Sequence, residues 1–179
     1  MLRKHCPPRW PPSAVLFGLQ VATAGPAAAA PRILYYDASQ AQEFIAVVNQ
    51  GAQIWTAGSP TCSSSPSGRP HPEHRVYADN GCRRTYSTSL GNGRWYMGRE
   101  AVNDGYYQPR DRAAHEFGHI LGLPDRRTGL CADLMSGSSA PVSCRNPNPN
   151  ATEAATVNNN FRSAGAAVAV PAREYAWVG

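Results

Sequence analysis

The chain has 179 residues, 42% of them hydrophobic and 16% charged, which is enough for one domain with its own core. Its formal net charge is +5, but the first thirty residues hold Arg3, Lys4 and Arg9 and no acid, so the remainder carries +2. Lysine and arginine do not cluster with interleaved aromatic residues, and this argues against a protein that binds nucleic acid.

Residues 1–30 have the pattern of a secretory signal peptide. The positive start is followed by a short apolar stretch, Ser13 to Ala24, and by alanines at 27–30. This stretch is too short to span a bilayer, and nothing downstream is longer. We therefore expect a secreted, extracellular protein with no membrane segment after signal removal. A short propeptide stays an open alternative. The domain should cover residues 31–165, followed by an alanine-rich tail at 166–179.

The first part of the domain alternates between strand and helix patterns. Arg32–Tyr36 is rich in strand formers. A helix capped by Ser39 should follow and end near Asn49–Gly51, where both residue types favour a helix C-terminus. A short strand is predicted at Ile54–Thr56. The Gly-, Ser- and Pro-rich residues 57–74 indicate a surface loop.

The loop contains His71 and His74. We expect both to be solvated, because no third ligand residue lies at a spacing typical of a metal site. Beyond it, apolar and aromatic runs predict three more strands, the last two forming a hairpin through Gly91-Asn92-Gly93. These strands are Arg75–Ala78, Thr85–Leu90 and Arg94–Met97.

Two helices are predicted in the second half of the chain. Pro109 is well placed to begin the first, because proline is favoured at the first helical position. Its broad apolar surface, which includes Phe117 and Ile120, should place it at the centre of the domain. The second covers Asn150 to Arg162, with Glu153 in its first turn. We therefore predict an α+β fold: a small, mixed, twisted sheet with a central helix and a C-terminal helix.

One short stretch carries the residue types of a metal site. His115-Glu116-Phe117-Gly118-His119 is followed by Gly122 and then Asp125. On a helix, residues four apart share a face, so His115 and His119 can hold one metal ion together. Gly122 allows a sharp turn that returns Asp125 toward the same point. Two imidazoles, one carboxylate and an open fourth position are typical of a catalytic zinc site.

Glu116 is the neighbour of the first ligand and leans over the open side of the metal. A single zinc ion lowers the pKa of a bound water to about 7. Glu116 can take a proton from this water and pass it to a leaving amine. The assembly fits hydrolysis of an amide bond, so we expect a zinc endopeptidase acting on protein or peptide substrates. An extended peptide could add as an extra strand along Thr85–Leu90.

The chain has five cysteines, of which Cys6 would leave with the signal. An even number then remains in an oxidising compartment, which indicates disulfides. Three pairings are open, and we favour the local pairs Cys62–Cys82 and Cys131–Cys144. Each could add on the order of 3 kcal/mol through the unfolded state. A four-thiolate zinc site is disfavoured, because the Cys-x-x-Cys spacing is missing.

Residues 115–125, with Met135 following in Leu134-Met135-Ser136-Gly137, resemble the zinc endopeptidases of the snapalysin family. These are small secreted neutral proteases of actinobacteria and close relatives of the metzincins. The resemblance covers roughly residues 31–163 and implies a zincin-like fold with an aspartate as third zinc ligand. It also implies that Met135 lies in the turn beneath the metal. Cys131 and Cys144 match the single disulfide of the family.

The chain departs from this family in two places. The family has a tyrosine two residues after the aspartate ligand, thought to aid the transition state, where this chain has Arg127. As a fixed cation, Arg127 could support a developing oxyanion. The calcium ligands of the family fall on Gln108 and Arg110, and an arginine repels calcium. We therefore carry no calcium site over; Asp104 or Asp111 is the remaining alternative.

Two alternatives to this hypothesis stay open, and in either case we expect a monomer. In a thermolysin-like site the third ligand is a downstream glutamate, and Glu153, 34 residues after His119, is the candidate. Alternatively, the chain is a secreted zinc-binding protease homologue with little or no catalytic turnover, a hypothesis motivated by Arg127. The retained Glu116 argues against this second alternative, because a binding module has no use for that base.

Overall fold

A computed structural model describes residues 32–59, 62–66, 68, 70–100, 109–162 and 172–176. The predicted signal segment lies outside the described residues, as do Asp104, Gln108 and most of the predicted tail. Within the described ranges, no helix combines the length and apolarity needed to cross a lipid bilayer.

The described strands form one mixed, six-stranded sheet in the order β2-β1-β3-β5-β4-β6. Neighbours run parallel from β2 through β1 and β3 to β5, whereas β4 is antiparallel to β5 and β6 is antiparallel to β4. The predicted α+β class and mixed sheet are therefore confirmed. The strands are β1 (Arg32–Gln40), β2 (Cys62–Pro66), β3 (His74–Asp79), β4 (Arg84–Ser89), β5 (Asn92–Gly98) and β6 (Arg173–Ala176).

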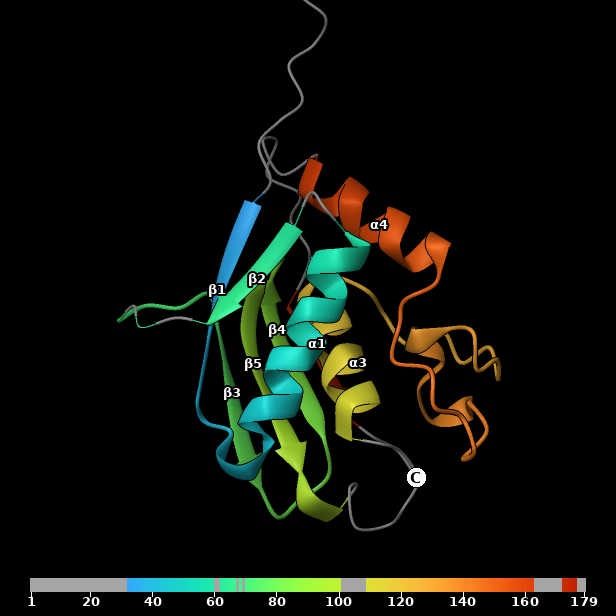
Figure 1. Cartoon of the computed structure of the whole chain (residues 1–179), viewed down its shortest axis with the longest axis horizontal. Helices are drawn as coiled ribbons and strands as arrows, with labels where there is room; N and C mark the ends of the chain where they lie inside the picture. The colour runs from blue at the N-terminus through green and yellow to red at the C-terminus, as the bar shows by residue number, and fades with distance from the viewer. Residues whose placement is uncertain are drawn as a thin grey trace, which may run out of the picture.

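Helices α1 (Ile45–Gly58) and α3 (Pro109–Ile120) lie side by side over one face of the sheet, and α4 (Ala151–Arg162) packs at one end of this layer (Figure 1). Trp55 on α1 donates from its indole nitrogen to the carbonyl of Ala114 on α3 at 2.7 Å. Phe117 and Ile120 are fully buried, so the predicted central position of α3 is confirmed. A 3-10 helix, η1 (Gln42–Phe44), precedes α1, and another, η2 (Leu134–Ser139), follows α3.

The two faces of the sheet differ, as the period of two along a strand requires. The face beneath the helices is apolar and buried; it includes Leu34, Tyr36, Val76, Trp95 and Met97. The opposite face carries tyrosines stacked with arginines, with the Arg84 guanidinium 3.9 Å from the ring centre of Tyr96. Cation–π contacts of this kind let aromatic strand residues face water. The core therefore lies between the sheet and the α1–α3 layer.

The prediction for residues 49–56 is wrong. Helix α1 does not end near Gly51 but continues through Ile54–Thr56 to Gly58. Gly51 serves close helix packing instead, because a Cβ there would lie 2.9 Å from the backbone carbonyl carbon of Ala113 on α3. The glycine that resembled a helix C-terminus is thus the residue at which α1 packs against α3.

The predicted loop at residues 57–74 also needs correction. It contains strand β2, which pairs with β1 and ends the sheet. His71 is exposed, as predicted, but His74 is only 1% exposed at the start of β3. Its ring stacks on Tyr36 at 5.8 Å between centroids and meets the edge of Phe117 at 5.3 Å. His74 is therefore a core residue beneath α3.

One of the two predicted disulfides is present. Cys131 and Cys144 are bonded, with their Cα atoms 5.4 Å apart. Cys82 is outside any disulfide, and its thiol donates to Glu100 Oε2 at 3.3 Å. The predicted Cys62–Cys82 pair is wrong because Cys62 begins β2 whereas Cys82 precedes β4, and β1, β3 and β5 lie between them. Four strand spacings are about 19 Å, well beyond the roughly 7 Å between Cα atoms that a disulfide tolerates.

Candidate metal centre

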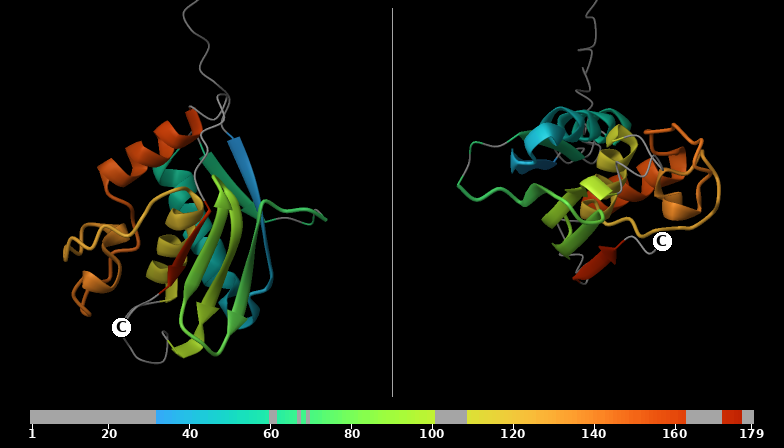
Figure 2. Two further views of the ribbon diagram at one scale, coloured as in Figure 1. Left: turned by 180° about the vertical axis from the view of Figure 1, so that it is seen from behind. Right: turned by 90° about the horizontal axis from the view of Figure 1, so that it is seen from below.

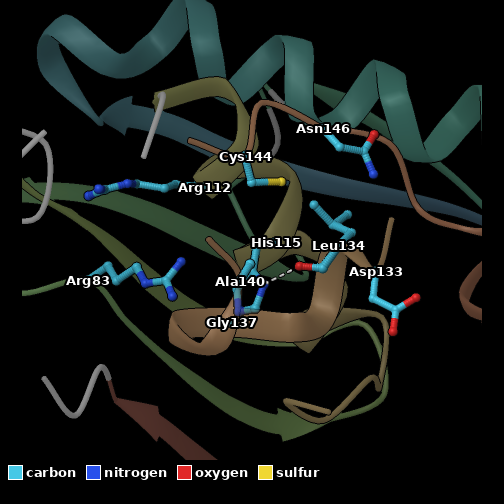
Figure 3. A pocket seen from close by; sticks show the side chains of 9 residues that line it. All are labelled: Arg83, Arg112, His115, Asp133, Leu134, Gly137, Ala140, Cys144 and Asn146. Atoms are coloured by element: carbon cyan, nitrogen blue, oxygen red, sulfur yellow. Dashed lines mark hydrogen bonds between the residues drawn. The ribbon is translucent and has the colours of Figure 1, made fainter. Parts of the chain in front are cut away.

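His115 and His119 lie one turn apart on α3, both buried, with ring centroids 4.7 Å apart. The Nδ1 atom of each ring faces a backbone carbonyl at 2.8 Å: Leu134 for His115, drawn as the dashed line in Figure 3, and Leu123 for His119. A carbonyl only accepts hydrogen bonds, so each neutral ring carries its proton on Nδ1. The Nε2 lone pair of each ring is thereby left to act as a ligand.

The chain leaves α3 by the predicted glycine turn. Gly122 has φ +92°, and its N–H donates to the carbonyl of His119 at 3.0 Å. The turn brings Asp125 Oδ1 to 3.1 Å from His115 Nε2 and 3.7 Å from His119 Nε2. Ligand atoms of the three residues all lie within 4.8 Å of one another. The structure therefore brings together the three residues that the sequence pattern singled out.

These three atoms form a donor set that suits a metal cation. Both Nε2 atoms present lone pairs, and Asp125 Oδ1 is buried with no hydrogen-bond donor. Burial raises the pKa of Asp125, but contact with His115, the nearby His119 and the charge of Arg83 outweigh it, so the pKa falls to about 2. Burial and the neighbouring His115 lower the pKa of His119 to about 4. At neutral pH Asp125 is therefore a carboxylate and His119 a neutral imidazole, which are the forms that bind metal.

Met135 lies directly against the ligand-bearing helix. Its side chain is fully buried in η2, and a Cβ added at Gly118 would come within 2.5 Å of its sulfur. Gly118 lies between the two histidines in sequence, so Met135 packs against the turn of α3 that carries them. The carbonyl of Met135 also accepts from the N–H of Arg126 at 2.7 Å, next to Asp125. Met135 in η2 thus contacts both α3 and the loop that carries Asp125.

Glu153 anchors the same turn from the other side. Its carboxylate is buried and accepts from the N–H groups of Leu134, Met135 and Asn150 at 3.2, 2.8 and 2.7 Å. The N–H of Glu153 in turn donates to Asn150 Oδ1 at 2.8 Å, which makes a capping box at the start of α4. Among the described residues, the metal-ligand cluster comprises His115, His119 and Asp125 and excludes Glu153. The structure thus gives no support to the thermolysin-like alternative.

Two contacts to Glu116 come from residues that the sequence analysis did not single out. Thr85 on β4 donates from its hydroxyl to Glu116 Oε2 at 2.5 Å. Arg83, just before β4, places its Nε 3.6 Å from Glu116 Oε1, and both side chains are buried. Strand alternation could have placed Thr85 on the helix-facing side of β4, but the pairing with α3 spans 31 residues in sequence. A pattern within one segment does not predict a contact between residues so far apart in the sequence.

Arg83, rather than Arg127, is the buried cation beside Glu116. Arg127 is exposed and has a left-handed backbone, with φ +51°. Arg83 lines a small cavity of about 30 Å³ next to His115, with its guanidinium directed toward that ring (Figure 3). The space is sufficient for water. The position of the family tyrosine therefore holds a solvent-exposed side chain, and the buried cation that contacts Glu116 is the residue just before β4.

Comparison with known protein sequences shows the family to which the chain belongs. The sequence model of the Streptomyces extracellular neutral proteinase (M7) family matches residues 31–164. The chain therefore belongs to this family, which confirms the resemblance found in the sequence and its extent.

Three relatives are each named extracellular small neutral protease. The proteins from Streptomyces lividans and Streptomyces caespitosus are 37% identical over 137 and 123 residues, which are 75% and 69% of this chain. The protein from Streptomyces sp. strain C5 is 33% identical over 145 residues, or 79% of this chain. The alignments cover 59%, 92% and 63% of these three relatives, so the chain spans less than two thirds of two of them.

Proposed function

We propose that this protein is a secreted, extracellular zinc endopeptidase that hydrolyses peptide bonds in proteins. The observation that carries the proposal is the convergence of two Nε2 lone pairs and Asp125 Oδ1 on one point, with Glu116 as the next residue of the same helix. Two imidazoles and one carboxylate suit zinc and leave room for further ligands. Membership of a neutral proteinase family and the names of the relatives support the same activity.

In this proposal His115, His119 and Asp125 hold one zinc ion, which supplies Lewis acidity by polarising a carbonyl and acidifying a water molecule. Glu116 is the general base: it takes a proton from the attacking water and gives it to the leaving amine. Its carboxylate is held by Thr85 and Arg83. Arg83 adds a positive charge at the side where an oxyanion develops, a role that we propose for it in place of Arg127.

A substrate in this proposal lies as an extended strand beside β4. Main-chain hydrogen bonds at a sheet edge bind a peptide with little regard to its sequence. Thr85 on β4 donates to Glu116, so a strand paired with β4 on the side away from β5, the position that β6 takes in the structure, runs past Glu116. An extended peptide added there would pass the candidate metal centre.

The test is cleavage of casein by the purified, zinc-loaded protein, with and without a chelator. Glu116→Gln should lower kcat by more than about 100-fold, because general-base catalysis contributes that much, while zinc content stays at one ion per chain. The matched control is Glu43→Gln, which changes an exposed glutamate and should cleave at the normal rate. Equal rates for Glu116→Gln and the control would refute the proposal. A zinc-loaded protein that cleaves nothing would favour the non-catalytic homologue.

A further inference from the structure

The outer edge of β4 is occupied by the C-terminal segment of the same chain. Strand β6 pairs antiparallel with β4 over four positions, with Arg84 opposite Ala176 and Ser87 opposite Arg173. Figure 2 shows β6, in red, running along β4 on the side that faces α3. This is the edge on which the proposed function places an extended substrate. Residues 173–176 of the predicted tail thus form the sixth strand of the sheet.

The register of β6 places one side chain against the candidate metal centre. Tyr175 lies opposite Thr85, the residue whose hydroxyl donates to Glu116. The ring of Tyr175 is stacked on the ring of His119, with centroids 3.8 Å apart and planes 6° from parallel. Alternation along the strand turns Glu174 to the opposite, exposed face. Only one face of β6 therefore contacts the site.

The family domain and this strand are separate parts of the sequence. The family model ends at residue 164, whereas β6 begins at Arg173. The strand therefore makes a specific contact with the site from outside the part of the chain that defines the family.

We propose that residues 173–176 are an autoinhibitory strand that occupies the place of the substrate, and that removal of the tail activates the enzyme. The inference rests on the proposed function, since it needs β4 to be the substrate edge. A tethered segment competes at an effective concentration on the order of millimolar. Substrate binds only to the fraction of molecules in which the strand is released, so the apparent affinity falls to that fraction of its value in the open form.

The main experiment compares the full chain with a variant lacking residues 172–179. If nine molecules in ten are closed, deletion raises kcat/KM for casein about tenfold, chiefly through a lower KM. Tyr175→Ala tests the same contact without truncation and should raise kcat/KM at least about threefold. Glu174→Ala is the matched control on the exposed face of β6 and should leave kcat/KM unchanged.

A synthetic peptide of residues 172–179 provides the converse measurement. It should inhibit the truncated protein competitively, and the same peptide with Tyr175→Ala should inhibit at least about tenfold more weakly. Unchanged kcat/KM in both the deletion and Tyr175→Ala, together with no inhibition by the peptide, would overturn the proposal. A loss of activity in both variants would also overturn it, because the strand would then be needed for catalysis.

Hydrogen exchange separates this inference from the proposed function. In the Glu116→Gln background, deletion of residues 172–179 should speed exchange of β4 amide hydrogens that pair with β6, and the peptide should restore protection. If no variant cleaves casein while β4 shows this protection, the proposed function fails and the strand contact stands. If casein is cleaved and β4 exchanges equally with and without the tail, the autoinhibitory strand fails alone.

Discussion

The two walls of the candidate site are assembled in different ways. One wall consists of His115, His119 and Asp125, which come from a single helix and the turn that follows it. The other consists of Arg83 and Thr85, which reach Glu116 only because β4 lies beside α3. Local spacing therefore sets the ligand geometry, and long-range sheet pairing sets the surroundings of the base. Substitutions in the first wall should lower zinc affinity, whereas substitutions in the second should lower kcat while the zinc stays bound.

The largest effect should come from the third ligand. Asp125→Ala removes the only carboxylate of the cluster, so zinc affinity should fall by more than about 100-fold, beyond the loss seen when residues behind the ligands are changed. Casein cleavage should disappear with it. The measurement is metal content by mass spectrometry after dialysis at neutral pH. Asp37→Ala, on β1, is the matched control and should retain one zinc ion per chain.

Glu153 should affect stability without affecting the metal. Glu153→Ala leaves three backbone N–H groups without their acceptor, at roughly 1–3 kcal/mol each, so the free energy of unfolding should fall by about 4 kcal/mol. Urea unfolding of the zinc-loaded proteins measures this, with Thr156→Ala on the exposed part of α4 as a control within about 0.5 kcal/mol of wild type. If the folded Glu153→Ala protein lost its zinc while Asp125→Ala kept it, the thermolysin-like assignment would be correct.

His74 should make the core sensitive to acid. Burial lowers its pKa from 6.5 to about 4, so the unfolded chain takes up a proton more readily than the folded one between these values. The stabilisation is fully present above pH 6.5 and is lost as the pH falls toward 4, on the order of 3 kcal/mol in total. His74→Phe keeps a ring between Tyr36 and Phe117 and should flatten the dependence. Urea unfolding at pH 7.5 and 4.5, with saturating zinc, measures the difference; equal slopes for both proteins would exclude this role.

The candidate ligand wall could be predicted from the sequence because each of its requirements is local. The arrangement of His115, His119 and Asp125 follows from three local features. These are the spacing of four residues, a glycine in the left-handed region and a carboxylate three positions later. The hairpin, the central helix and the C-terminal helix were predicted for the same reason. Their patterns of apolar residues and caps lie within the elements themselves.

The rest depends on contacts between distant parts of the chain. Gly51 has the pattern of a helix end, yet it is a point where α1 and α3 touch, which requires knowledge of both helices. Cys62 and Cys82 are close in sequence but belong to opposite sides of the sheet, because three strands are inserted between theirs. Thr85 and Tyr175 are likewise joined only by strand pairing. Strand order is a global property, and periodicity along one segment carries no information about it.

The smallest effects should distinguish two arginines of the second wall. Arg83→Gln removes the buried cation beside Glu116, so kcat should fall about tenfold or more while KM and zinc content change little. Arg83→Lys keeps the charge and should recover part of kcat. Arg127→Gln makes the same chemical change at an exposed position and should alter kcat less than about twofold, because exposed charges contribute little in water. Steady-state kinetics on a peptide substrate measures all three variants. A large loss for Arg127→Gln with a normal Arg83→Gln would return the oxyanion role to the position of the family tyrosine, in the turn after α3.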